Sequence, residues 1–178
     1  MKVLKKVALV FAALLVIFLI VVALQPADYK ITRSATISAP PSAVFAQVND
    51  FHKWEAWSPW AKLDPSVKNT FEGSPAGKGA IFKWVGNDKV GEGQMTVTDS
   101  KPDEQILIDL HFIKPFESSC LTEFTFKPDG DKTNVTWTMS GHNGFISKAF
   151  CLFMNMDKMV GGDFEKGLAS MKTVAEAK

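Results

Sequence analysis

The sequence is poor in the residues that catalytic and metal sites use most often. Its 178 residues include two cysteines, three histidines and one tyrosine. Cys120 and Cys151 form no Cys-x-x-Cys pair, and no cluster of metal-ligating residues accompanies them. The chain also has no serine nucleophile elbow and no glycine-rich phosphate loop. These absences disfavour metal chemistry and the common nucleophilic and phosphate-binding mechanisms, and we expect no cofactor.

A marked excess of charge of either sign is also missing. Beyond residue 24 the chain holds 17 basic and 19 acidic residues, which gives a net charge of −2. A nucleic-acid-binding domain normally carries a clustered excess of Lys and Arg. We therefore expect no nucleic-acid partner. Low-complexity segments and internal repeats are absent as well.

What the sequence does have is a long apolar run near its start. Every residue from Val7 to Leu24 is apolar, and three lysines (Lys2, Lys5 and Lys6) precede this run. Eighteen helical residues extend about 27 Å, close to the hydrocarbon thickness of a bilayer, which is about 30 Å. An uncleaved transmembrane anchor fits this length better than a signal peptide, whose apolar region is shorter and ends at a small-x-small site. Both interpretations export the rest of the chain.

The distribution of basic residues predicts an orientation. The lysines before the run favour a cytoplasmic N-terminus and an extracytoplasmic domain. Lys30 and Arg33, which follow the run, weaken this argument. We expect a single-pass membrane protein with an anchor at residues 1–24, a linker at 25–28 and one domain at 29–178.

The sequence of the domain predicts, in order, a strand, two short helices, six strands and a long helix. Alternation predicts the first strand from Tyr29, and Pro41 and Asp50 suit the first turn and the cap of the two helices. The last helix carries an apolar stripe at Val160, Phe164, Leu168, Met171 and Ala175. The remaining strands are expected near 69–72, 80–85, 90–99, 105–113, 118–127 and 133–140, and a shorter helix near 145–153.

Close spacing with Gly, Asn, Asp and Pro between the strands predicts antiparallel hairpins. We therefore expect an α+β fold in which one antiparallel seven-stranded sheet wraps around the C-terminal helix. Gly161 and Gly162 interrupt that helix, and either a kink or a close packing partner would explain them.

Strand alternation also predicts the face that the sheet turns toward the helix. Its side chains are almost all apolar, with Cys120 and Thr122 as the polar members, whereas Asp109 and His111 point away. Such a face is either a filled core or the lining of a cavity. For a cavity, the expected ligand-binding residues are Trp57, Phe82, Trp84, Met95, Ile108, Leu110, Phe112, Phe124, Trp137, Met139, Val160 and Phe164.

Several motifs give the chain a family resemblance. They are Ile-Ser-Ala-Pro-Pro-Ser-Ala-Val-Phe at 37–45, Asn-Asp-Phe-His-Lys-Trp-Glu-Ala-Trp-Ser-Pro-Trp at 49–60, Val-Gly-Glu-Gly at 90–93 with Gly86-Asn87 before it, and Met-Asp-Lys-Met-Val-Gly at 156–161. Over about residues 29–177 the chain resembles the START/Bet v 1-like (SRPBCC) superfamily, in particular bacterial proteins of the polyketide cyclase/dehydrase and lipid-transport type.

The resemblance implies a helix-grip fold with a cavity for an apolar ligand between the sheet and the last helix. It also implies that the membrane in which the protein is anchored is a bacterial inner membrane. That superfamily includes lipid carriers, quinone binders, hormone receptors and aromatase/cyclase enzymes, so the fold does not choose among these activities. A membrane-anchored binding protein for a hydrophobic small molecule or lipid is the interpretation we favour.

Two alternatives remain open from the sequence. A cyclase- or dehydratase-like enzyme would need an acid or base in the cavity, such as Glu92 (re-aimed by a bulge at Gly91 and Gly93), Asp109 or Asp157. A membrane-tethered interaction or sensing domain would have a filled core and no ligand. The spacing of Trp54, Trp57 and Trp60 suits either a gate at the cavity mouth or packing against the sheet. Cys120 and Cys151 fit either two free thiols or a disulfide.

Overall fold

The computed structural model describes residues 2–177. Met1 and Lys178, which begin the expected anchor and end the expected domain, lie outside the described residues. Seven strands and five helices make up the described chain. The helices are α1 (Lys2–Leu24), α2 (Pro41–Asn49), the 3₁₀ helix η1 (Phe51–Ala56), α3 (Phe145–Cys151) and α4 (Met156–Glu176). The strands are β1 (Asp28–Ile37), β2 (Lys68–Gly73), β3 (Ala80–Val85), β4 (Glu92–Lys101), β5 (Gln105–Lys114), β6 (Ser118–Asp129) and β7 (Lys132–His142).

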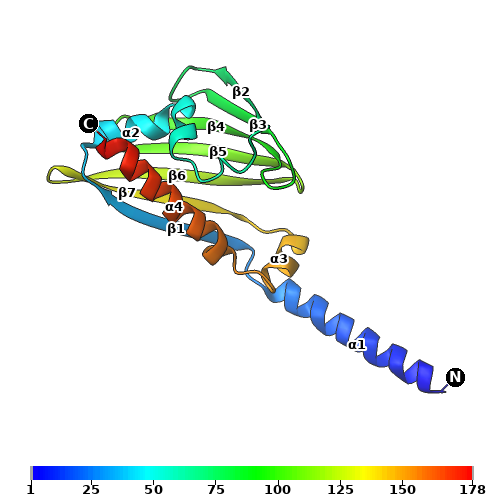
Figure 1. Cartoon of the computed structure of the whole chain (residues 1–178). Coiled ribbons are helices and arrows are strands. Elements are labelled where there is room, and N and C mark those ends of the chain that lie inside the picture. The colour runs from blue at the N-terminus through cyan, green and yellow to red at the C-terminus, as the bar shows by residue number, and fades with distance from the viewer. Residues whose placement is uncertain (1, 178) are drawn as a thin grey trace.

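All seven strands form one antiparallel sheet with the order β1-β7-β6-β5-β4-β3-β2. Each strand from β2 to β7 pairs with its neighbour in sequence, as short hairpin turns require. The first strand closes the other edge by pairing with the last, for example Ile31 with Met139. The predicted α+β helix-grip fold is confirmed, and α4 lies across one face of the sheet (Figure 1).

The apolar stripe predicted on the last helix faces the sheet. Phe164, Leu168 and Met171 are fully buried, and Val160, one turn before Phe164, is half-buried. The ring of Phe164 stacks on that of Trp137 in β7 with the centroids 4.0 Å apart. Side chains of α4 thus pack over β1 and β7, at one side of the sheet.

The two short helices cover one end of the same face. Pro41 begins α2, and the Asp50 carboxylate accepts a hydrogen bond from the His52 amide at the start of η1, as expected of a cap. Trp54 and Trp57 are buried, and their indole N–H groups donate to the carbonyls of Val48 and Gln47. These two tryptophans therefore pack against the sheet and do not form a gate.

The sheet has two distinguishable ends. At the distal end lie α2 and the end of β1 at Ile37. At the proximal end lie the first residue of β1, Asp28, paired with His142, and the last residue of β5, Lys114, paired with Glu92. The proximal end is next to α1 and α3 (Figure 1).

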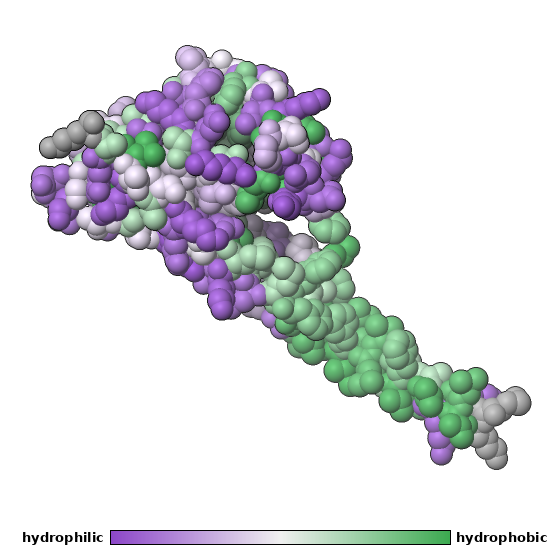
Figure 2. All heavy atoms as spheres, in the orientation of Figure 1, coloured by the Kyte–Doolittle hydropathy of each residue, from purple (hydrophilic) through white to green (hydrophobic). Residues whose placement is uncertain are grey.

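Helix α1 projects away from the domain as a single rod (Figure 1). Its segment Val3–Leu24 is long and apolar enough to cross a membrane, and a signal sequence near an N-terminus would have the same properties. Nearly all of its side chains are exposed, and their hydrophobic surface continues onto the base of the domain (Figure 2).

Candidate functional site

The candidate site is the apolar interface between the sheet and α4, which has two unlike halves. The inner positions of β5 illustrate them most simply. Ile106 and Ile108, toward the distal end, are completely buried. Leu110 and Phe112, the next two inward positions toward the proximal end, are only half-buried. One apolar stripe therefore passes from a packed region into an open one.

The packed half is an aromatic cluster centred on Trp137. The indole of Trp137 stacks on Phe164 and on Phe124, with centroids 4.0 Å and 4.8 Å away, and meets Trp57 edge-on at 5.7 Å. All four side chains are at most 2% exposed. Close stacking of this kind leaves little room for a ligand. The four residues of this cluster were predicted as ligand contacts, and in this structure they are part of the core. The same holds for Ile108, which is also buried.

The open half is lined by aromatic rings of β3 and β5. Phe82 stacks on Trp84 at 5.9 Å, and Trp84 meets the Phe112 ring edge-on at 6.0 Å. Gly93 of β4 lies under Trp84, and a Cβ on that glycine would be 2.4 Å from the indole ring. The indole N–H donates to the Val90 carbonyl at 3.0 Å, which fixes the orientation of the ring.

Met95 and Met139 lie between the two halves. Both point to the inner face and retain slight exposure, 8% and 7%. Thioether side chains adapt their shape easily, so they form a deformable border between the packed cluster and the open rings. With Val160 at the edge of α4, this places all twelve predicted residues on one continuous apolar interface.

Two polar groups occupy the inner face of the open half. Tyr29 of β1 packs over Gly141, where a Cβ would be 2.6 Å from the phenol oxygen. Burial, reinforced by the neighbouring Cys120 thiol, raises the pKa of Tyr29. Burial likewise raises the pKa of Cys120 to about 11, so this thiol stays protonated near neutral pH. Cys120 and Cys151 are free thiols, which is the first of the two alternatives that the sequence left open.

Arg33, the register partner of Trp137, ties β1 to α4. Its guanidinium contacts the Asp157 carboxylate at 2.9 Å and the Glu165 carboxylate at 2.7 Å. The hydrogen bonds from Arg33 hold the pKa of Asp157 below its usual range. A Cβ on Gly161 would be 2.1 Å from this guanidinium, whereas one on Gly162 would meet nothing within 4 Å. A close packing partner therefore explains the first glycine.

A buried carboxylate supports the rim of the open half. Asp64 accepts hydrogen bonds from the Ser66 amide and hydroxyl, and from the Asn87 amide in the β3–β4 loop at 2.7 Å. These hydrogen bonds, first that of the Ser66 hydroxyl, lower the pKa of Asp64. No sequence pattern singles out Asp64, because one Asp in a polar stretch is ordinary.

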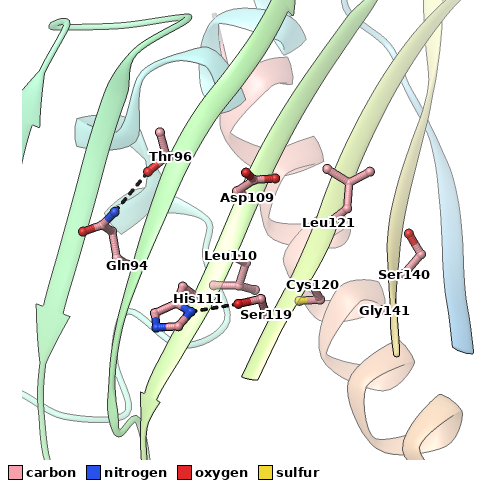
Figure 3. Close-up of a pocket in the computed structure, with 10 residues that line it drawn as sticks. All are labelled: Gln94, Thr96, Asp109, Leu110, His111, Ser119, Cys120, Leu121, Ser140 and Gly141. Atoms are coloured by element: carbon pink, nitrogen blue, oxygen red, sulfur yellow. Dashed lines mark hydrogen bonds between the residues drawn. The ribbon is translucent and has the colours of Figure 1, made fainter. Parts of the chain in front are cut away.

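The carboxylates that an enzyme would need do not converge on the open half. The register shifts between Glu92 and Gly93, but the extra residue is Ile113 of β5 and not a residue of β4, where the bulge was expected. Glu92 forms an ion pair with Lys114 at 2.7 Å. Asp157 is paired with Arg33, as described above. Asp109 is exposed and lies with His111 and Ser119 on the sheet face opposite α4 (Figure 3).

That opposite face has an open hollow of about 570 Å³. Its lining is mainly polar and comes from β4 to β7, and the His111 Nδ1 atom lies 2.8 Å from the Ser119 hydroxyl (Figure 3). The outward orientation predicted for Asp109 and His111 is confirmed. Within residues 2–177, no group of three or more His, Cys, Asp or Glu side chains is arranged to hold a metal ion.

Comparisons with known proteins agree with this geometry. The chain resembles protein CV1439 from Chromobacterium violaceum at 14% identity and a TM-score of 0.62, over 84% of this chain and 98% of that one. It resembles Mll3558 from Rhizobium loti at 20% identity and a TM-score of 0.58, over 83% and 96% of the two chains. It also resembles CalU16 from Micromonospora echinospora at 12% identity and a TM-score of 0.57, over 84% of this chain and 75% of that one.

These identities establish a shared fold and no shared activity. Comparison with curated proteins gives no match. The profile of a family described as "Polyketide cyclase / dehydrase and lipid transport" matches residues 28–176, which include the whole sheet and α4. The chain therefore belongs to the polyketide cyclase/dehydrase and lipid-transport family.

Proposed function

We propose that this protein is a membrane-anchored binding protein for a hydrophobic small molecule or lipid, held between the open half of the sheet and α4. The observation that carries the proposal is the change along β5, from the buried Ile106 and Ile108 to the half-buried Leu110 and Phe112. A folded domain normally buries such residues, because each CH₂ group removed from water stabilises the folded state by about 0.8 kcal/mol. An apolar ligand in the open half would cover them.

The chemistry of the open half suggests the kind of ligand. Phe82, Trp84 and Phe112 offer flat aromatic surfaces, and the Tyr29 hydroxyl offers one polar contact. A ligand with a long apolar body and an oxygen at one end would use both kinds of contact, and binding by area favours broad selectivity.

Membrane anchoring is part of the same proposal. With α1 across the bilayer and its lysines in the cytoplasm, the domain lies outside, with its proximal end toward the lipid surface. A hydrophobic molecule could then leave the bilayer for the open half with little exposure to water. The engagement of Glu92 with Lys114 and of Asp157 with Arg33 favours binding over acid–base catalysis.

Native mass spectrometry with lipid extraction on the full-length protein, purified from membranes, tests this proposal. We expect a co-purifying apolar molecule at near-unit stoichiometry. Leu110→Trp should reduce its occupancy by filling the open half, whereas Leu121→Trp, the same change on the outer face of the neighbouring strand β6, should preserve it. An unliganded mass, next to a control lipid binder that keeps its cargo, would favour the interaction or sensing domain instead.

A further inference from the structure

The segment 145–154, which contains α3, has an unusual surface for a domain of this kind. Phe145, Ile146, Phe150 and Phe153 are 49%, 68%, 52% and 79% exposed, and α3 buries none of its residues. An amphipathic helix on a water-soluble surface normally turns its apolar side inward. The segment carries one charged residue, Lys148. Water is therefore a poor environment for this segment.

Contacts with α1 fix the position of the segment along that helix. Phe153 stacks on Phe18 with the ring centroids 6.4 Å apart. Val22 is 0% exposed, unlike its neighbours on α1. The Lys148 ammonium donates to the carbonyl of Ala23 at 2.8 Å, at the end of the helix. Phe18 precedes Leu24 by six residues, which corresponds to about 9 Å along the helix axis.

We infer that residues 145–154 are embedded in the bilayer leaflet in which α1 ends, with Phe153 in the hydrocarbon region and Lys148 at the headgroup level. This inference rests on the proposed membrane anchoring of α1. If α1 spans the bilayer, a ring that stacks on Phe18 lies at the depth of Phe18. The lysine suits the headgroup level, because a long cationic side chain reaches the interface from an apolar surface.

The backbone of the segment is compatible with such a position. Lipid supplies no hydrogen bonds, so a buried backbone must satisfy its own groups. The amides of Phe153 and Met154 both donate to the Phe150 carbonyl, which continues the helical bonding beyond α3. On the domain side, Phe150 lies 6.2 Å from Phe116 in the β5–β6 turn, centroid to centroid. The apolar surface of α1 thus continues through α3 to the proximal end of the sheet (Figure 2).

Depth-dependent fluorescence quenching tests this inference on the full-length protein in vesicles of phosphatidylcholine and phosphatidylglycerol. A nitrobenzoxadiazole label is placed at Met154→Cys in a Cys120→Ala, Cys151→Ser background, which leaves the Phe18–Phe153 contact intact. Quenchers are lipids that carry a doxyl group either near the headgroup or near the chain end. Ile17→Cys, beside Phe18, reports the depth of α1, and Asp131→Cys in the distal β6–β7 turn reports solvent. Near-UV circular dichroism verifies the fold of each labelled protein.

We expect acyl-chain quenchers to reduce the fluorescence at Met154 as strongly as at Ile17, with no loss at Asp131. Quenching at Ile17 without quenching at Met154 would overturn the membrane position of the segment and leave the anchor intact. A blue-shifted but unquenched label at Met154 would do the same, and would indicate that a protein surface covers the segment. Absence of quenching at Ile17 would instead overturn the anchor, and with it the proposed function.

Discussion

The distal and proximal halves of the sheet–helix interface have similar side chains but different environments. Distally, Trp137 and Phe164 stack in a cluster from which solvent is excluded. Proximally, Trp84 and Phe112 touch each other yet remain partly exposed. One apolar face thus has two environments. The distal half forms the packed core, and the proximal half leaves apolar surface partly exposed, where we propose that the ligand binds.

The largest expected effect comes from truncating one phenylalanine in each half. Phe164→Ala removes the ring that stacks on Trp137, and we expect it to lower the free energy of unfolding by about 3–5 kcal/mol. Phe112→Ala, the same change in the open half, should cost less, about 1–2 kcal/mol, because that ring is already partly exposed. Denaturant unfolding of the full-length protein in mild detergent measures both. Equal losses would contradict the division into two halves.

A smaller effect on the free energy of unfolding is expected at Gly161, where α4 packs on Arg33 of β1. Gly161→Ala would place a Cβ against the Arg33 guanidinium and disturb its ion pairs with Asp157 and Glu165. We expect a loss of about 1 kcal/mol, moderated because the arginine head is flexible. The neighbouring Gly162→Ala is the matched control and should gain up to about 1 kcal/mol, since alanine favours the helix and the site is open. A thermal melt of each variant compares the two, and equal shifts would show that Arg33 does not require the glycine.

The smallest expected effect concerns the rim of the open half at acid pH. The pKa of Asp64 is lowered in the folded protein, so its stabilising contribution is present above the unfolded value of about 3.9 and is lost as pH falls through the folded pKa. Asp64→Asn should therefore be less stable than wild type at neutral pH, and the difference should shrink as the pH falls below about 4. Ser66→Ala, which removes one donor to this carboxylate, should give the same trend with smaller size. A stability difference between Asp64→Asn and wild type that does not change with pH would contradict this role for Asp64.

The sequence was a good guide to the fold because its periodicities are local. Alternation along 105–113 identified the inner positions of β5, and the spacing from Val160 to Met171 identified the buried stripe of α4. The division of the interface could not be predicted in this way. Ile108 and Leu110 have the same side-chain chemistry and the same orientation, and their burial differs because of where α4 and η1 lie over the sheet.

The tryptophans and α3 show the same limit. A spacing of three fitted a gate as well as a packed helix, and only the tertiary contacts of Trp54 and Trp57 distinguish the two. A helix near 145–153 was predicted, but its exposure was not. The signal available in the sequence was a run of apolar residues broken by Lys148 alone.

Photolabelling can show whether a bound apolar molecule lies in the open half. The full-length protein in vesicles is irradiated with a photoreactive diazirine fatty acid, and the labelled peptides are mapped by mass spectrometry. We predict label on the open half, at Leu110 and Phe112 in β5 and at Trp84 in β3, with loss of that label in Leu110→Trp. Label confined to α1 and the segment 145–154, with none on the inner face of the sheet, would contradict the proposal that the open half holds a ligand.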